Sequence, residues 1–183
     1  GGRQIARRLR EDGELSEVRG MGATVPAAGS GGAGLYLTQI GDSRAYLVGR
    51  GRAIQLTKDQ SLMQRLVDAG ELTEEEAEHS ERRNIILQAL GPESQIKVDL
   101  THQQVRRGDT LVLCSDGLSG QVRIDEIGRV VSEEPDLMSV GKQLIDRANE
   151  HGGPDTLPVI AGGFDGAGPP AAQSGANVGG PGV

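Results

Sequence analysis

The sequence predicts an α+β fold in which an antiparallel β-sandwich is flanked by helices. Early in the chain, short stretches rich in apolar and β-branched residues follow one another with only brief polar or glycine-rich turns between them. This pattern is typical of a meander of antiparallel strands. Nearer the C-terminus, two segments carry apolar residues at helical spacing. Consecutive strands followed by helices favour a layered α+β domain over a doubly wound parallel sheet.

The expected strands divide into an early and a late group. They lie at residues 23–28, 35–40, 44–48 and 53–56, and then at 96–99, 110–114 and 156–161. A glycine-flanked turn at residues 49–51 joins two of the early strands, and a glycine patch at residues 29–34 suits a hairpin or loop. Pro26 and Pro158 do not suit central strands, because proline has no N–H to donate to the neighbouring strand.

Helices are expected where apolar residues recur on one face. Leu62, Leu66 and Ala69 share a face after Asp59, and Gly70 is a natural C-terminal stop. A second short helix is expected to begin at a capping box formed by Thr73 and Glu76, and further helices are expected at residues 2–11, 124–131 and 136–150.

Composition excludes several classes of function. The 183 residues suit one domain, and 26 acidic against 19 basic residues give a net charge of −7, which argues against a nucleic-acid partner. The chain has only three aromatic residues, too few for a base-stacking surface. We expect no membrane span and a cytoplasmic protein, since no apolar run approaches the length of a membrane helix. The single cysteine, Cys114, is most simply a buried structural thiol.

The chemistry is expected at three aspartates that stand where an apolar stretch meets glycine. Asp42 and Asp116 follow expected strands, and Asp155 precedes one. In an antiparallel sheet these strand ends can share one edge, so the three carboxylates are expected to converge. Clustered carboxylates repel one another unless a cation neutralises them, and an all-oxygen site suits Mg²⁺ or Mn²⁺. The alternative for each aspartate alone is a turn residue held by local hydrogen bonds.

Six blocks of the sequence give the pattern a family resemblance. They are residues 21–24 (MGAT), 41–59 (GDSRAYLVGRGRAIQLTKD), 66–84 (LVDAGELTEEEAEHSERRN), 88–91 (QALG), 108–118 (GDTLVLCSDGL) and 148–155 (ANEHGGPD). In order and spacing they resemble the bacterial branch of the type 2C metal-dependent serine/threonine protein phosphatases, over residues 20–165. The resemblance implies a four-layer αββα sandwich that hydrolyses phosphoserine and phosphothreonine esters by a metal-activated water.

The resemblance also implies roles for particular residues. Asp116 and Asp155 correspond to ligands of the family's two-ion Mn²⁺ or Mg²⁺ centre, and Asp42 to the aspartate of a third, weaker ion found in some members. Residues 58–90 correspond to the flap beside the active site. Supporting positions around the three aspartates are Gly41, Ser43, Arg44, Ser115, Gly117 and Gly153. We expect Arg44 to make a charge-assisted hydrogen bond.

The family's N-terminal third has no counterpart in this sequence. Residues 1–19 offer neither the metal-bridging aspartate of that region nor its phosphate-binding arginine, so no catalytic residue is assigned. We expect residues 1–165 to be the C-terminal two-thirds of a phosphatase domain, inactive or weakly active alone, and residues 166–183 to be a disordered tail. The implied partners are phosphorylated proteins and a cognate serine/threonine kinase. The alternative is a non-catalytic phosphatase-like module that binds phosphoproteins or regulators.

Overall fold

The computed structural model describes residues 25–31, 34–89, 96–153 and 157–165, with the backbone alone described for residues 25–31. The expected helix at residues 2–11, the expected tail at 166–183 and Asp155 lie outside these ranges. Among the helices that are described, none has the length and apolar character needed to cross a membrane.

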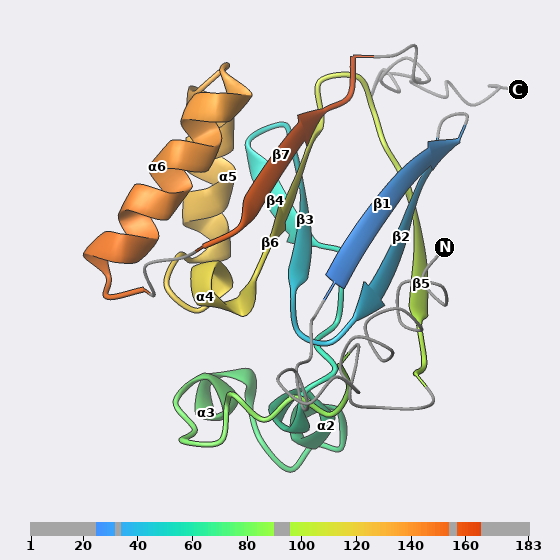
Figure 1. Ribbon diagram of the computed structural model, residues 1–183, viewed down its shortest axis with the longest axis vertical. Helices are drawn as coiled ribbons and strands as arrows, with labels where there is room; N and C mark the ends of the chain where they lie inside the picture. Colours follow the sequence, from blue (N-terminus) through green and yellow to red (C-terminus); the bar gives the residue numbers. More distant parts are fainter. Residues whose placement is uncertain (1–24, 32–33, 90–95, 154–156, 166–183) are drawn as a thin grey trace, which may run out of the picture.

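Two antiparallel sheets pack against each other as a sandwich (Figure 1). The smaller sheet has the order β1-β2-β5 and consists of β1 (Val25–Gly31), β2 (Gly34–Ile40) and β5 (Asp99–Gln104). The larger sheet has the order β4-β3-β6-β7 and consists of β4 (Arg52–Gln55), β3 (Arg44–Gly49), β6 (Thr110–Cys114) and β7 (Val159–Gly163).

The helices form two groups (Figure 1). The helices α4 (Asp116–Ser119), α5 (Ile124–Glu133) and α6 (Leu137–Glu150) lie along the outer face of the larger sheet, and the helices α2 (Leu62–Asp68) and α3 (Glu74–Glu78) lie beyond one end of the sandwich. The predicted α+β class and the antiparallel sandwich with flanking helices are therefore confirmed. Within the described residues, helices cover the outer face of the larger sheet but not that of the smaller one.

Alternation along β3 divides the core into two parts. Tyr46 and Val48 are 2% and 3% exposed and belong to a cluster with residues of the three outer helices. Ala45 and Leu47 point the other way, into a cluster with Leu37 of the smaller sheet. Because successive side chains of a strand face opposite sides, one strand supplies both layers of the core. Each fully buried large apolar side chain contributes about 1.5–3 kcal/mol.

Pro26 and Pro158, which do not suit central strands, are compatible with the fold. Pro26 lies in β1, which has a single neighbour among the described strands, β2, and Pro158 comes just before β7. Proline is tolerated at an edge strand or outside a strand because no neighbouring carbonyl requires its missing N–H.

Several expected boundaries were wrong. The strand expected at residues 96–99 lies instead at Asp99–Gln104, the last strand at Val159–Gly163 instead of 156–161, and the expectation missed the single-turn helix α4. Half-buried and exposed positions alternate along β5, but its apolar residue, Leu100, stands at an exposed position and is 68% exposed, whereas polar residues occupy the half-buried positions. The position of this polar strand is set by its backbone pairing with β2, and the pattern of polar residues in the sequence does not predict that pairing.

Candidate metal centre at one edge of the sandwich

The register of the larger sheet brings two of the three expected aspartates to one edge. Arg44 at the start of β3 is opposite Cys114 at the end of β6. Asp42 comes just before this pair and Asp116 just after it, so both lie at the same edge of the antiparallel sheet. β7 begins at this edge too, because Val159 is also opposite Cys114.

Asp116 begins helix α4 directly after the sheet ends. Its Oδ1 accepts a hydrogen bond of 2.9 Å from the backbone N–H of Gly117, and its side chain is exposed. Ser115 is the N-cap residue but makes no side-chain capping bond. Within the described part of the chain, Asp116 Oδ2 accepts no hydrogen bond and the carboxylate forms no ion pair. This oxygen is therefore available as a ligand.

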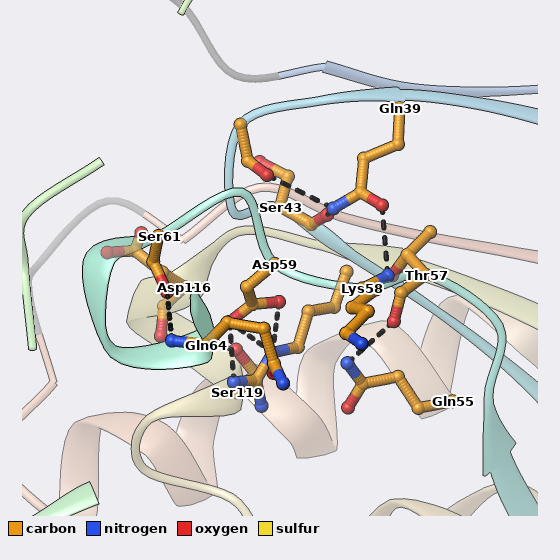
Figure 2. Close-up of polar contacts among 12 residues, drawn as sticks. Gln39, Ser43, Gln55, Thr57, Lys58, Asp59, Ser61, Gln64, Asp116 and Ser119 are labelled. Carbon is orange, nitrogen blue, oxygen red and sulfur yellow. Dashed lines mark hydrogen bonds and ion pairs between the residues drawn. The ribbon is translucent and has the colours of Figure 1, made fainter. Parts of the chain in front are cut away.

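Asp42 lies in the tight connection between β2 and β3 and is only 6% exposed. The preceding Gly41 has φ = 91°, which an L-residue with a side chain rarely adopts. The Gln39 side chain closes the connection, since its Nε2 donates to the carbonyls of Gly41 at 3.1 Å and Ser43 at 3.3 Å (Figure 2). Its Oε1 accepts from the Lys58 N–H at 3.1 Å. The backbone on either side of Asp42 is thus held by Gln39.

Gln60 holds the same connection from the other side. Its Oε1 accepts from the Gly41 N–H at 2.8 Å, and its own backbone N–H donates to the Gly41 carbonyl at 2.9 Å. Both backbone groups of Gly41 are therefore bonded to one residue, which lies 19 positions later in the chain.

The charge-assisted hydrogen bond expected of Arg44 is made with Asp59. Arg44 Nε and Nη2 donate to the Asp59 carboxylate at 3.0 and 2.7 Å, in the two-pronged geometry favoured by a guanidinium and a carboxylate. The guanidinium also reaches the Tyr46 hydroxyl at 3.5 Å. This pair joins the start of β3 to the segment that leads into α2 (Figure 2).

The structure describes two of the three expected aspartates. Asp155 lies outside the described residues, and the described residues nearest to it, Gly153 and Leu157, are half-buried and buried. Within the described ranges, no group of three or more His, Cys, Asp or Glu side chains is placed to hold a metal ion. The structure thus places Asp42 and Asp116 at one edge, and the role of Asp155 stays a prediction.

Comparison with known proteins identifies the family. No family model matches the chain. The serine/threonine phosphatase Stp of Listeria welshimeri is 36% identical over 144 residues, which are 79% of this chain and 57% of that protein. The crystal structure of the serine/threonine phosphatase PstP/Ppp of Mycobacterium tuberculosis is 35% identical with a TM-score of 0.82, covering 90% of this chain and 69% of that one.

The chain belongs to the type 2C family of metal-dependent serine/threonine protein phosphatases. A crystal structure of the PstP catalytic domain in complex with two manganese ions is 36% identical with a TM-score of 0.74, covering 85% of this chain and 65% of that one. The chain therefore spans 57–69% of the length of these relatives.

Residues 58–90, which the family resemblance predicts to be the flap and which we call the flap, are described as far as residue 89. It leaves the sandwich after Asp59, forms α2 and α3, and returns through an antiparallel bridge between Ser61 and Ile86. Backbone bonds of 2.9 Å from Leu62 N–H to the Ile85 carbonyl and of 2.8 Å from Leu87 N–H to the Gln60 carbonyl close its base. The flap thus begins and ends beside the connection that carries Asp42.

Position 153 requires glycine because the backbone passes close to the end of α6, which the sequence alone did not indicate. A Cβ at this position would lie 2.7 Å from the carbonyl oxygen of Ala148, and the Gly153 N–H donates to that same oxygen at 2.8 Å. The close approach turns the chain at the end of α6, immediately before residues 154–156.

Sequence reasoning missed three residues that hold the edge, namely Gln39, Asp59 and Gln60. One signal was available for Gln39. Gln39 follows Leu35 and Leu37 at every second position along β2, so its side chain points into the core as theirs do. A polar side chain that is buried in this way requires hydrogen-bond partners. Gln60 and Asp59 gave no local signal, because their partners are distant in sequence.

The Cys114 thiol is 3% exposed, as expected of a structural cysteine. Burial raises its pKa to about 12, so the reactive thiolate is suppressed at neutral pH. A thiol held neutral supplies no nucleophile at this edge.

Proposed function

We propose that the protein is a metal-dependent serine/threonine protein phosphatase whose divalent ions bind at the edge where β3 starts and β6 ends. The observation that carries this proposal is the pairing of Arg44 with Cys114, which brings Asp42 and Asp116 to one edge of the larger sheet. Asp155 is assigned to the same site from its position shortly before β7, which also begins at this edge.

The donor chemistry fits Mn²⁺ or Mg²⁺. Carboxylate oxygens are the preferred ligands of these hard cations, and Asp116 has an oxygen free of other described partners. The related PstP catalytic domain is in complex with two manganese ions. When bound, such ions withdraw charge from a phosphoryl group and favour ionisation of a coordinated water.

The residues around the aspartates orient them. The Gly117 N–H holds one oxygen of Asp116, and the other oxygen accepts no hydrogen bond from the described residues. Gly41 and Ser43, both held by Gln39, fix the backbone on either side of Asp42. Arg44 is a positioning residue, because its guanidinium is occupied by Asp59 and does not serve the phosphate.

The proposed substrates are phosphoserine and phosphothreonine residues of proteins, and the proposed setting is the cytoplasm beside a cognate serine/threonine kinase. Serine/threonine phosphatases act on phosphorylated proteins, and the relatives carry that name. The acidic net charge of −7 suits a divalent-cation site better than direct capture of a phosphate by surface charge.

The test uses the full chain and a matched pair of substitutions. Asp116 and Asp125 both stand in the first turn of a helix, α4 and α5, but Asp125 is paired with Arg123 and is not an expected ligand. We expect Asp116→Asn to weaken Mn²⁺ binding in calorimetric titration at least about tenfold, because a charged ligand is lost, and Asp125→Asn to leave it unchanged. Equal affinities in the two variants would remove Asp116 from the site.

Hydrolysis is measured in parallel with p-nitrophenyl phosphate and a phosphothreonine peptide. Mn²⁺-dependent turnover that Asp116→Asn abolishes supports the enzyme. Mn²⁺ binding and phosphopeptide binding without turnover favour the alternative, a non-catalytic phosphatase-like module.

A further inference from the structure

A cavity of about 390 Å³ lies at the end of β3 that is farthest from the aspartate edge. Its walls come from the turn between β3 and β4, from β4 itself, and from the end of β5 with the connection that follows. Both connections lie at the end of the sandwich opposite α2 and α3 (Figure 1). Along β3, Gly49 beside the cavity is separated from Arg44 at the aspartate edge by about 17 Å. The cavity is therefore distinct from the proposed metal site.

Three arginines line this cavity, Arg50 and Arg52 on the hairpin of β3 and β4 and Arg106 after β5. All three are exposed, and within the described part of the chain their guanidinium groups form no ion pair or hydrogen bond. Asp109 is the one acidic residue of the lining, so the local charge is +2 although the whole chain carries −7. A phosphate monoester carries about −1.5 to −2 at neutral pH, and guanidinium groups match its oxygens in geometry as well as in charge.

Arg50 adopts a backbone conformation that arginine does not favour. Arg50 and Gly51 form the two-residue loop between the paired residues Gly49 and Arg52, with φ = 53° at Arg50 and 75° at Gly51. Asparagine, aspartate or glycine is preferred at the first position of such a loop, because most side chains crowd the backbone at positive φ. In the described ranges, Arg50 is the one residue other than glycine with a positive φ. Backbone strain of this kind is concentrated at functional sites, and here it places a guanidinium at the cavity.

Asp109 holds the two sides of the cavity together. Its Oδ2 accepts a hydrogen bond of 2.8 Å from the Arg106 N–H, and a Cβ at Gly49 would overlap its Oδ1. The carboxylate thus packs against the bare backbone of Gly49 and keeps the turn that carries Arg106 beside the hairpin. In contrast to the arginines, the lining residues Leu47 and Val105 are buried, 6% and 7% exposed. The cavity is therefore preformed, with a basic rim and an apolar floor.

We propose that this cavity binds the phosphate group of a phosphorylated protein segment. The arginines bond the phosphate oxygens, and the apolar floor takes an apolar side chain next to the phosphorylated residue. A free phosphate ion satisfies the arginines but leaves the apolar floor without a partner, which favours a peptide as the ligand. The proposal goes beyond the proposed function, because this site needs no metal and hydrolyses nothing.

The test is calorimetric titration of the full chain in EDTA with a peptide that carries leucine beside phosphothreonine. EDTA removes divalent ions, so the peptide stays intact and the proposed metal site is not loaded. We expect Arg52→Gln and Arg106→Gln each to weaken binding at least about tenfold, because each removes a charge-assisted hydrogen bond. Arg129→Gln removes the same charge from an exposed residue of α5 outside the cavity, and it is expected to leave binding unchanged. No binding by the natural sequence, or an equal loss in all three variants, overturns the proposal.

Arg50→Asn separates binding from folding. Asparagine tolerates positive φ better than arginine, so the variant is expected to unfold at a temperature about 2 °C higher. The same variant is expected to bind the phosphopeptide at least about tenfold more weakly, because a guanidinium is lost from the rim. A variant that binds the phosphopeptide as tightly as the natural sequence shows that Arg50 does not serve this ligand and overturns the proposal.

Two further ligands establish what the cavity recognises. The unphosphorylated peptide is expected to bind at least about tenfold more weakly than the phosphopeptide, because the arginines lose their partner. Inorganic phosphate is also expected to bind at least about tenfold more weakly, because it buries no apolar surface on the floor. Equal affinity for the unphosphorylated peptide overturns recognition of phosphate. Equal affinity for inorganic phosphate shows that the ligand is the free ion and overturns the assignment to a phosphorylated protein.

Discussion

Arg44 and Asp59 form a fork of hydrogen bonds, with Nε to Oδ1 at 3.0 Å and Nη2 to Oδ2 at 2.7 Å, at the point where the flap leaves the sandwich. Burial opposes the positive charge, but the bonds to Asp59 outweigh it, so the pKa of Arg44 lies above its usual value. The guanidinium stays charged at every accessible pH. The pair therefore acts as a permanent clamp between β3 and the flap.

Asp59→Ala is expected to lower the free energy of unfolding by about 2–3 kcal/mol, because it leaves the half-buried guanidinium without a counter-charge. Denaturant titration measures the change. The control is Asp68→Ala, which removes an ion pair whose Lys58 and Asp68 side chains are 63% and 45% exposed, and it is expected to have no measurable effect. Similar losses in the two variants would show that the fork is an ordinary surface pair.

Gly153→Ala is expected to disturb the turn before residues 154–156. The added methyl would lie 2.7 Å from the Ala148 carbonyl oxygen, so the turn must shift at a cost of about 1–3 kcal/mol. If Asp155 is a ligand, calorimetric titration also detects weaker Mn²⁺ binding.

The control for this substitution is Gly141→Ala inside α6, where a Cβ meets nothing within 4 Å. It is expected to stabilise the protein by up to about 1 kcal/mol, since alanine favours the helix. A Gly153→Ala protein as stable as Gly141→Ala contradicts the close approach.

Where strong local patterns existed, the sequence was enough to predict the element. The apolar run at 110–114 and the alternation at 44–48 became β6 and β3 with nearly the same bounds, and the capping box of Thr73 and Glu76 starts α3 as expected. These signals are local, because burial and capping leave a mark within a few residues.

Features held by distant partners were not predictable. The position of β5 is determined by its backbone pairing with β2, so its polar sequence did not predict where it begins and ends. The sequence around Gln60 gives no sign that its side chain bonds Gly41, Gln88 and Asp99. Asp42 and Asp116 were predicted as site residues because Gly-Asp and Asp-Gly pairs are typical of strand ends. Their supports were not found, because a hydrogen bond across 19 residues leaves no periodic trace.

Thr73→Ala is expected to loosen α3 without unfolding the sandwich. The Thr73 hydroxyl accepts from the Glu76 N–H at 3.2 Å, and the Glu76 carboxylate accepts from the Thr73 N–H at 2.8 Å. Loss of the cap lowers the local stability by about 1 kcal/mol, measured as faster exchange at residues 74–78. Glu75→Ala, on the same helix but outside the box, is the control, and equal exchange in both variants would contradict the role of the cap.

The same box predicts a pH dependence for α3. The bonds from Thr73 hold the pKa of Glu76 below its ordinary value. A carboxyl group with a lowered folded pKa stabilises the fold above its unfolded pKa and loses that contribution as the pH falls toward the folded value. The protection factors of residues 74–78, which compare the observed exchange with the intrinsic exchange at the same pH, are therefore expected to fall in acid more steeply in the natural sequence than in Glu76→Gln.

Cys114 provides the corresponding prediction in alkali. Burial raises the pKa of its thiol from 9.0 to about 12, so the folded state keeps the proton that the unfolded state releases. The resulting stabilisation is complete below pH 9.0 and is lost as the pH rises toward 12, with a slope of at most about 1.4 kcal/mol per pH unit. Cys114→Ala is expected to show a shallower fall in unfolding free energy over this range. Iodoacetamide at pH 8 should label the natural protein only after unfolding in urea, and rapid labelling of the folded chain would show that the thiol is not buried.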